Sequence, residues 1–463
     1  MPTDFAGKYV VVMGLGRFGG GIGVTRWLAA QGARVHVTDL SPEDKLSDSL
    51  KALKGLNLTF RLGGHEESDL DGCDLLVVNP AVDKRKASFF QAAVRRGIPW
   101  SSEMNLFLAR CPGRIVGITG TVGKSTTTAM VGAILDEAKQ AKDWPHGRVW
   151  LGGNIGKSLL DAVADMKPND IVVLELSSFQ LEDAAECRRS PQVALVTNLR
   201  ENHLDRHGTI EAYAAAKANI ARFQTLDDWL ILPFEGVDLF PRDWLARPRL
   251  YRFGVVSETR QIRLVYPKDG RQVLEEISAT LAVPGLHNLE NAAGALAIAR
   301  ILGVRDEVSL AALRRFSGLA HRLEFVREFQ GVRYYNDSKA TSPEAAMTSM
   351  RAFDGGLIVL VGGSDKGSSF VELGRMLATR AKAVICMGET GDRIRGEIVP
   401  VEPDGRRPII KTASNSQEAV DLARSLASPG DVVLLSPGCA SFDWYRNYEE
   451  RGDTFKLLVR GLT

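Results

Sequence analysis

The chain has 463 residues, 44% of them apolar and 25% charged, which is enough for about three domains with separate cores. Its 58 Lys and Arg residues are balanced by 56 Asp and Glu residues, so it lacks the basic excess of a nucleic-acid-binding protein. No apolar signal core and no run of about 18 uncharged apolar residues occurs, so we expect a cytoplasmic protein without a membrane partner. The five cysteines form no CxxC pair, which argues against a disulfide framework or a thiolate zinc site.

The first predicted domain, residues 1–104, alternates apolar runs with helical patterns. The runs Tyr9–Met13, Arg34–Thr38 and Asp74–Val78 are typical of buried strands, and Trp27 and Leu28 lie at helical spacing between the first two. Strands that alternate with helices predict a parallel, doubly wound sheet of Rossmann-like type.

A glycine pattern follows the first of these strands. Gly14, Gly16 and Gly19 have the G-x-G-x-x-G spacing, and Asp39 ends the next strand about twenty residues later. In a dinucleotide fold these glycines allow close approach of a pyrophosphate, and the acid accepts a hydrogen bond from a ribose hydroxyl. The same geometry would accept a nucleotide sugar, so the pattern alone leaves the ligand open.

A second α/β domain is predicted for residues 105–318. Its strands are Arg114–Thr119, Ile171–Leu176 and Val193–Thr197, and the first leads through a glycine turn into a helix. From about residue 225 to 285 the pattern changes to short β-like pieces with many Pro and Gly residues. We interpret this stretch as an antiparallel side region attached to the second domain.

The strongest local signal lies between the first strand and the first helix of this domain. Thr119-Gly120-Thr121-Val122-Gly123-Lys124-Ser125-Thr126 has the strand–turn–helix setting of a phosphate-binding loop. Backbone N–H groups at a helix N-terminus surround phosphate oxygens, a lysine meets the β/γ charge and a hydroxyl reaches magnesium. The strict pattern is missed because Ile118 replaces its first glycine. A chance Gly-Lys-Ser in a helix-initiating turn is the alternative.

Three further side chains of this domain are candidates for the same site. Glu175 ends one predicted strand and His203 follows another, so both are expected at the carboxyl edge of the sheet, where parallel sheets bind ligands. A solvated strand-end acid and a structural loop histidine are the alternatives. Lys217 shares the apolar face of an Ala-rich helix with Tyr213 and Ile220, so it either meets an anion or snorkels along apolar surface.

A third α/β domain is predicted for residues 319–463, with four apolar runs that stop at polar or glycine residues. Three strand ends carry cationic or hydroxyl groups: Asn336–Thr341, Asp365–Gly367 and Cys439–Ser441. Together with Arg322 they suit a small dicarboxylate, although each could be a simple turn. Before this domain, the side-chain amides of Asn288 and Asn291 could bind the edge of a nucleotide base. Alternatively, an asparagine at this place could cap the helix that follows. The tripeptide Arg451-Gly452-Asp453 looks like an adhesion motif, which we interpret as coincidence in a cytoplasmic chain.

These elements occur in the order seen in the Mur ligases, and the chain resembles that family over nearly its whole length. Four strings resemble the members that join glutamate to UDP-N-acetylmuramoyl-L-alanine in peptidoglycan precursor synthesis. They are Leu174-Glu-Leu-Ser-Ser-Phe-Gln-Leu181, Gly318-Leu-Ala-His-Arg322, Asn336-Asp-Ser-Lys-Ala-Thr341 and Leu435-Ser-Pro-Gly-Cys-Ala-Ser441.

The resemblance implies a first domain for the UDP-substrate, a central ATPase domain and a C-terminal domain for the amino acid. It implies ATP and Mg²⁺ as cofactors, with D-glutamate as the favoured amino acid and a monomeric state. Lys124, Glu175, His203 and Lys217 would be catalytic, with Lys217 carbamylated. Ser125, Glu175, His203 and Lys217 would hold magnesium.

The resemblance also implies the residues that contact each substrate. ATP would be held by Gly120, Thr121, Gly123, Lys124, Ser125, Thr126, Asn288 and Asn291, with Arg322 and Asp337 closing that site. Substrate contacts would come from Leu15, Gly16, Arg17, Asp39, Asn79, Asn154, Lys339, Thr341, Lys366, Ser441, Phe442 and Tyr448. Three positions depart from the family pattern, namely Val122, Asn202 and Leu40, where the family usually has Asn, an acid and Thr.

The implied reaction suits these residue types. The alanyl carboxylate attacks the γ-phosphorus of ATP, and cations neutralise the charge that gathers on the phosphoryl oxygens. The resulting acyl phosphate is attacked by the amino group of glutamate to form an amide. A ligase for L-glutamate, a nicotinamide-dependent dehydrogenase and a non-enzymatic phosphate-loop switch are the alternatives. A dehydrogenase function would not explain the presence of Lys124, Glu175 and Lys217.

Overall fold

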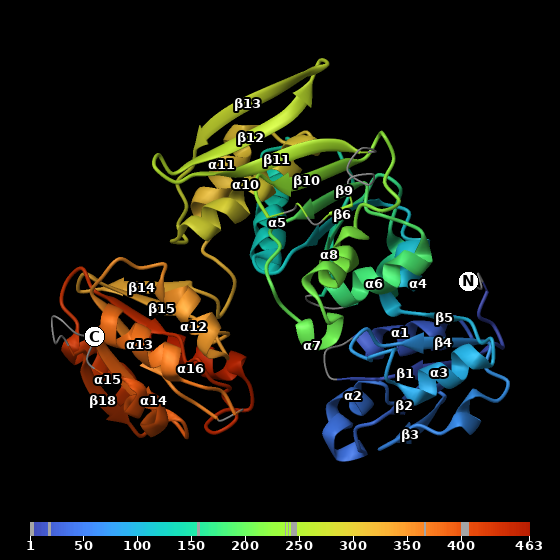
Figure 1. Ribbon diagram of the computed structural model, residues 1–463, viewed down its shortest axis with the longest axis horizontal. Coiled ribbons are helices and arrows are strands. Elements are labelled where there is room, and N and C mark those ends of the chain that lie inside the picture. Colours follow the sequence, from blue (N-terminus) through green and yellow to red (C-terminus); the bar gives the residue numbers. More distant parts are fainter. Residues whose placement is uncertain are drawn as a thin grey trace. The chain divides into compact units, whose positions relative to one another are not determined.

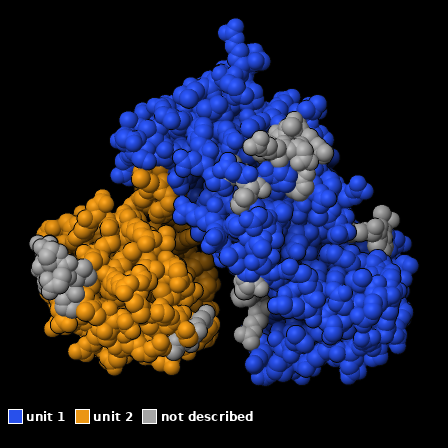
Figure 2. Space-filling model, viewed as in Figure 1, with its two compact units in different colours: residues 1–278, 290–312 blue, residues 279–289, 313–463 orange. Residues whose placement is uncertain are grey.

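The structure is a computed structural model that describes residues 4–16, 20–154, 158–236, 238, 240–241, 248–364, 367–399 and 407–463. The chain divides into two compact units, coloured separately in Figure 2. The first unit consists of Met1–Ser278 and Glu290–Ala312, and the second of Ala279–Leu289 and Leu313–Thr463. Within the described ranges, no helix is long and apolar enough to cross a membrane.

The first unit begins with a parallel five-stranded sheet in the order β3-β2-β1-β4-β5 (Figure 1). Its strands are β1 (Tyr9–Met13), β2 (Arg34–Asp39), β3 (Leu58–Leu62), β4 (Leu75–Val78) and β5 (Trp100–Ser101). Its helices are α1 (Gly20–Ala30), η1 (Glu43–Leu46), α2 (Ser47–Ala52), η2 (Glu67–Leu70) and α3 (Ser88–Arg95). Alternate residues of β1 enter two cores: Val10 belongs to the core that contains Leu28 of α1, and Val11 to the core that contains Phe89 of α3. Helices therefore cover both faces, as in a doubly wound sheet.

An eight-stranded sheet follows in the same unit, in the order β13-β12-β11-β10-β9-β6-β8-β7. Its strands are β6 (Arg114–Thr119), β7 (Val149–Gly153), β8 (Ile171–Glu175), β9 (Val193–Val196), β10 (Trp229–Pro233), β11 (Arg249–Val256), β12 (Gln261–Lys268) and β13 (Arg271–Ser278). Its helices are α4 (Glu103–Arg110), α5 (Lys124–Gln140), η3 (Leu160–Asp165), α6 (Ser178–Cys187), α7 (Leu204–His207) and α8 (Ile210–Ala218). Two further helices, α10 (Leu286–Ile301) and α11 (Asp306–Arg315), lie mostly in this unit, while residues 286–289 and 313–315 belong to the second unit.

The side region begins later than the sequence pattern predicts. Strands β10 and β11 run parallel to each other and to β9, so they extend the central sheet. Among the described strands of this sheet, the antiparallel pairs are β11 with β12 and β12 with β13. The long segment between β10 and β11 explains the difference, because a crossover connection permits parallel pairing where a tight hairpin would not.

The second unit holds a six-stranded sheet in the order β14-β15-β19-β16-β17-β18. Its strands are β14 (Glu324–Phe329), β15 (Val332–Asn336), β16 (Leu357–Val361), β17 (Ala381–Met387), β18 (Ile409–Ala413) and β19 (Val432–Leu435). Its helices are α12 (Pro343–Met350), α13 (Val371–Arg380), α14 (Gly391–Glu397), α15 (Ser416–Leu426) and α16 (Tyr448–Arg460). All its strand pairs are parallel except the β14–β15 hairpin. The three α/β sheets confirm the predicted fold class.

Candidate functional site

The phosphate-type loop joins β6 to α5 and is braced by the segment after β9. Thr121 N–H donates to the carbonyl of Asn198, and Val122 N–H donates to the Asn198 side-chain oxygen at 3.1 Å. Gly123 has φ 87° directly before α5, and a Cβ there would meet the side chain of Asn291 at 2.3 Å. Both the left-handed backbone and the close approach require glycine at this position.

The lysine of the loop folds back onto the loop backbone, and two hydroxyl residues follow it in sequence. Lys124 donates from Nζ to the carbonyls of Gly120 and Thr121 at 2.9 and 3.0 Å. Ser125 and Thr126 follow in the first turn of α5, half-buried and buried respectively. A positive helix end, a lysine and two hydroxyls therefore gather at one turn, which is the chemistry that binds a nucleotide phosphate.

Lys217, on α8, is buried at the same turn. Its side chain is 1% exposed, its Nζ donates to the carbonyl of Gly120 at 2.8 Å, and it lies 4.7 Å from the ring centre of Tyr213. Burial, and then the nearby charge of Lys124, lower its pKa to about 6, against a smaller opposing effect of Glu175. At neutral pH this amine is mostly uncharged, and a neutral amine is a nucleophile.

Glu175 ends β8, beside the strand that carries the loop. One carboxylate oxygen accepts a hydrogen bond from the Asn154 amide at 2.9 Å. The other is buried and has no hydrogen-bond partner, which fits a cation ligand because a buried carboxylate oxygen without a partner is costly. Among the described residues no three His, Cys, Asp or Glu side chains cluster as a ready metal site. A bound Mg²⁺ would therefore need other oxygen ligands besides Glu175.

His203 precedes α7, in the segment that follows β9. Its ring lies 5.1 Å from that of Phe179 and 6.4 Å from that of Tyr213. The Tyr213 hydroxyl lies 3.1 Å from that of Thr121, which links this aromatic group to the loop. The strands β9, β6 and β8 are neighbours, so His203, Lys124 and Glu175 follow the carboxyl ends of three adjacent strands. Tyr213 and Phe179 were not predicted, because aromatic side chains on helices are most often core residues.

A cavity of about 450 Å³ lies between the first two sheets of unit 1. Four predicted substrate residues line it, namely Leu15, Gly16, Asn79 and Asn154. Asp39 binds the glycine turn instead, since its carboxylate accepts from the N–H groups of Gly16 at 3.1 Å and Ser41 at 2.7 Å. The Asp39 carboxylate thus holds the backbone of the turn. A ribose hydroxyl, which we expected it to bind, would have to share this carboxylate with the two N–H groups. Arg17 lies outside the described residues.

The cavity wall also contains an acid that sequence reasoning missed. Glu103, the first residue of α4, lines the cavity and accepts a hydrogen bond from the hydroxyl of Ser158. Burial raises the pKa of this carboxyl group. Its sequence signal is ordinary, because acids are common in the first turn of a helix that is capped by a serine such as Ser102.

The predicted amino-acid site lies in unit 2, at the carboxyl ends of β15 and β19. Asp337, which was predicted to close the ATP site, also lies here. Its carboxylate accepts hydrogen bonds from the Leu323 N–H and the Ser436 hydroxyl, and burial raises its pKa to about 6. Arg322, which was predicted both for the dicarboxylate and for closing the ATP site, is half-buried. Of the other residues predicted for glutamate, Lys339 lies 5.9 Å from the Tyr448 ring, Thr341 follows in the same loop, Ser441 is buried and Phe442 is 67% exposed. Lys366 lies outside the described residues.

The two asparagines of α10 lie inside the helix. Asn288 is its third residue and donates to the carbonyl of Pro284 at 2.6 Å, so the alternative of a simple helix cap is wrong. Asn291, one turn on, lies 3.3 Å from the hydroxyl of Thr127 on α5. This second asparagine is therefore next to the phosphate-type loop.

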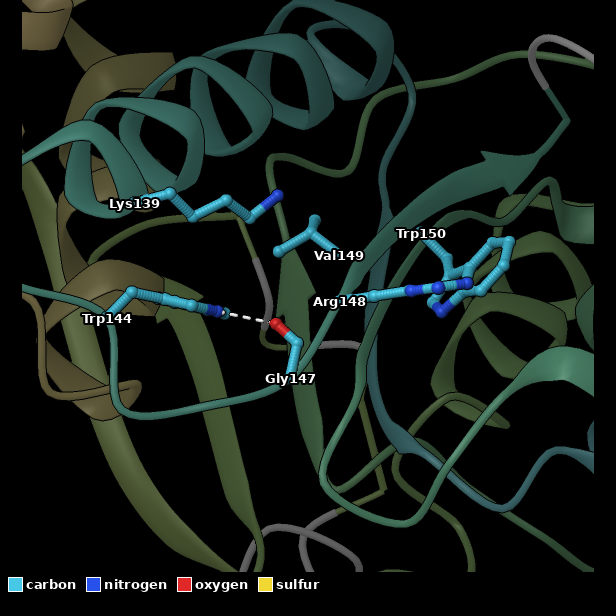
Figure 3. A pocket seen from close by; sticks show the side chains of 6 residues that line it. All are labelled: Lys139, Trp144, Gly147, Arg148, Val149 and Trp150. Atoms are coloured by element: carbon cyan, nitrogen blue, oxygen red, sulfur yellow. Dashed lines mark hydrogen bonds between the residues drawn. The ribbon is translucent and has the colours of Figure 1, made fainter. Parts of the chain in front are cut away.

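A second hollow, of about 390 Å³, lies at the other end of α5 (Figure 3). Lys139, Trp144 and Trp150 line it with Gly147, Arg148 and Val149. Both indoles are bound internally, Trp144 to the carbonyl of Gly147 at 2.7 Å and Trp150 to Asp170 at 2.9 Å. None of the predicted site residues that the structure describes lines this hollow, so we assign it no role.

Three family models match the chain. They are described as the Mur ligase MurD-like N-terminal domain, the Mur ligase middle domain and the Mur ligase glutamate ligase domain, and they match residues 8–101, 118–299 and 321–439. The solved structure of UDP-N-acetylmuramate-alanine ligase MurC from Thermotoga maritima shares the fold with a TM-score of 0.56. It has 20% identity, over 98% of this chain and 99% of that one.

Two relatives named UDP-N-acetylmuramoylalanine--D-glutamate ligase match along nearly their whole length. The relative from Roseiflexus sp. (strain RS-1) is 40% identical over 99% of this chain and 100% of its own. The relative from Pelotomaculum thermopropionicum is 38% identical over 100% of this chain and 99% of its own. On this evidence the chain belongs to the Mur ligase family.

Proposed function

We propose that this protein is an ATP-dependent ligase that adds D-glutamate to UDP-N-acetylmuramoyl-L-alanine in peptidoglycan precursor synthesis. The names of its full-length relatives support this reaction. The observation that carries it is the hydrogen bond between Asn154 and Glu175. Asn154 lines the cavity, and Glu175 ends the strand next to the phosphate-type loop. A substrate held in the cavity could thus present its carboxylate to ATP.

Each domain takes one substrate in this proposal. Residues 1–104 would bind the UDP part, with Leu15, Gly16 and Asn79 along the cavity wall. Residues 105–318 would bind ATP, and residues 319–463 would bind glutamate. For the glutamate carboxylates the candidate partners are Lys339, Thr341, Lys366, Ser441 and Tyr448, with Phe442 beside them.

In the first step the alanyl carboxylate attacks the γ-phosphorus of ATP, and ADP leaves. Lys124 would neutralise the charge that develops on the phosphoryl oxygens, as preorganised cations do in phosphoryl transfer. Ser125, Glu175, His203 and Lys217 would hold Mg²⁺, which lowers the cost of that charge when it is bound. For Lys217 this role requires a carbamate, because an amine has no oxygen to offer the metal.

In the second step the neutral amino group of glutamate attacks the acyl phosphate. A tetrahedral intermediate forms, the C–O bond to phosphate breaks, and inorganic phosphate leaves as the amide forms and the ammonium proton is lost. The enzyme contributes mainly by orienting the reactants and keeping water from the acyl phosphate.

An omission series tests the proposal. The purified protein is given ATP, Mg²⁺, UDP-N-acetylmuramoyl-L-alanine and D-glutamate, and each component is left out in turn. We expect ADP and a UDP-product heavier by one glutamyl residue only in the complete mixture. ADP formation that needs neither the UDP-substrate nor glutamate would instead indicate a phosphate-loop switch. Bound nicotinamide absorbance would indicate a dehydrogenase.

A further inference from the structure

Arg206 joins the segment that carries His203 to the first domain. It lies in α7, three residues after His203, and its side chain is 13% exposed. Its guanidinium donates to the carbonyls of Ala81 at 3.0 Å, Val82 at 2.6 Å and Pro80 at 3.4 Å. One planar cation thus holds the backbone of three consecutive residues, a task for which its fixed fork of donors is suited.

The segment that Arg206 holds forms part of the cavity wall. Pro80 and Ala81 line the cavity together with Asn79, whose side-chain amide donates to the carbonyl of Gly14 at 3.2 Å. Gly14 lines the cavity too. Any adjustment of this wall around a bound molecule therefore moves the carbonyls to which Arg206 is bound.

The other face of Arg206 rests on the aromatic group around His203. The guanidinium lies 4.7 Å from the ring centre of Phe179, which also lines the cavity. Phe179 in turn contacts His203 at 5.1 Å and stacks on His207 at 5.3 Å. His207 is fixed by the hydroxyl of Ser178 at 3.0 Å. Arg206 is thus connected to His203 both through the chain and through Phe179.

We propose that Arg206 is a positioning residue that couples occupation of the cavity to the placement of His203. The inference rests on the proposed function, in which the cavity holds the UDP-substrate and His203 serves the ATP site. Binding in the cavity fixes the backbone of residues 80–82. Because Arg206 is hydrogen-bonded to this backbone, α7 is then fixed as well. Since such coupling is reciprocal, nucleotide bound at the loop should tighten binding of the UDP-substrate by the same factor.

A second link between the same two domains provides a matched control. Lys84 pairs with the buried carboxylate of Asp183 on α6 at 2.7 Å. This pair spans the same boundary but ends on α6, whereas Arg206 ends on the segment that carries His203. Lys84→Met should therefore loosen the boundary without removing the connection to His203.

The test is calorimetric titration of UDP-N-acetylmuramoyl-L-alanine into the whole protein, with and without a non-hydrolysable ATP analogue and Mg²⁺. The ratio of the two dissociation constants is the coupling factor, which in proteins is typically about 5- to 150-fold. We expect a factor in that range for the native protein and for Lys84→Met. For Arg206→Met we expect a coupling factor near one. For Arg206→Lys we expect a coupling factor between that of Arg206→Met and that of the native protein. The same titration of nucleotide, with and without the UDP-substrate, gives a readout that does not depend on turnover.

Three results would overturn the inference. The first is a coupling factor of one in the native protein, and the second is an undiminished coupling factor in Arg206→Met. The third is an equal loss of the coupling factor in Arg206→Met and Lys84→Met, which would mean that Arg206 merely holds two domains together. Unchanged thermal unfolding of Arg206→Lys shows that this variant is folded. If the native protein does not bind the UDP-substrate at all, the proposed function fails, and that result is distinct from the other three.

Discussion

Lys217 shows how burial can turn a common side chain into a specialised one. Helical spacing with Tyr213 and Ile220 predicted that it faces inward, and the structure buries it to 1% exposure. The sequence could not show the cost of that burial, which lowers its pKa to about 6 and leaves a neutral amine beside Lys124. A neutral amine can add carbon dioxide, and the carbamate that forms is an anion suited to a cation site.

We therefore predict that Lys217 carries a carbamate in the native protein. After equilibration with ¹³C-bicarbonate, the carbamate carbon should give a ¹³C resonance that is missing in Lys217→Ala. That variant should lose nearly all ligation and regain part of it with formate or acetate, because a small carboxylate supplies the missing oxygens. Identical spectra for the two proteins, or full activity of the variant, would contradict the prediction.

For Lys124 we predict a loss of ligation of about a hundred- to thousandfold on substitution by alanine, the range for deletion of one strong transition-state donor. The fold should persist, because the hydrogen bonds from Lys124 Nζ to the carbonyls of Gly120 and Thr121 lie within the loop itself. Lys139→Ala, at the opposite end of α5, is the control and should keep native turnover. Turnover of Lys124→Ala equal to that of the control would rule out the ATP-site assignment.

At the scale of elements, buried strands were predictable and edge strands were not. The central strands β1, β8 and β16 are continuous apolar runs buried on both faces, which is the pattern that periodicity detects. The edge strands β3 and β18 are partly exposed and mix polar with apolar residues. Their sequences resemble loops, since an edge strand needs only one hydrogen-bonded neighbour and packs weakly.

The tripeptide Arg451-Gly452-Asp453 has an internal role in α16. Arg451 is 3% exposed and donates to the hydroxyl and carbonyl of Ser338, and to the carbonyls of Cys439 and Ala440. It therefore ties together the two loops that follow β15 and β19. The burial of its arginine agrees with the interpretation that the resemblance of this tripeptide to an adhesion motif is a coincidence.

We predict that Arg451→Lys raises the Michaelis constant for glutamate at least about tenfold, since hydrogen bonds to a charged group contribute about 1.5–3 kcal/mol each. The constants for ATP and the UDP-substrate should change less than about twofold, because the braced loops carry the proposed glutamate contacts. Kinetics with each substrate varied separately measure this. Arg446→Ala, which removes an exposed ion pair with Glu450, is the control. Equal rises for all three substrates would contradict a local role.

At the scale of the whole molecule, the contacts between the regions around the two sheets of unit 1 could not be predicted from the sequence. Arg206 binds residues more than a hundred positions away, and Lys84 meets Asp183 across a similar separation. No local pattern marks either residue, because each looks like an ordinary solvated charge until the two domains pack. The glycine turn and phosphate-type loop were predictable for the opposite reason, since their chemistry is fixed by neighbours in sequence.

The Lys84–Asp183 pair predicts a pH dependence. Burial raises the folded-state pKa of Asp183 to about 6, against the opposing charge of Lys84, while its ordinary value is 3.8. At pH values between about 4 and 6, the folded state binds more protons than the unfolded state. The contribution of Asp183 to the free energy of unfolding therefore grows as the pH falls. From pH 7 to 5 the native protein should gain about 1 kcal/mol relative to Asp183→Asn. Urea unfolding of both proteins at each pH measures this, and parallel profiles would contradict it.

The central claim concerns the amino acid that the whole molecule selects. Both enantiomers of glutamate carry the same charges, so the difference must come from geometry at the ends of β15 and β19 and in the neighbouring loops. The most direct measurement is phosphate release with ATP, Mg²⁺ and UDP-N-acetylmuramoyl-L-alanine, with D-glutamate or L-glutamate supplied in separate reactions. We predict rapid release with D-glutamate and background release with L-glutamate. Equal release with both, or faster release with L-glutamate, would contradict the account.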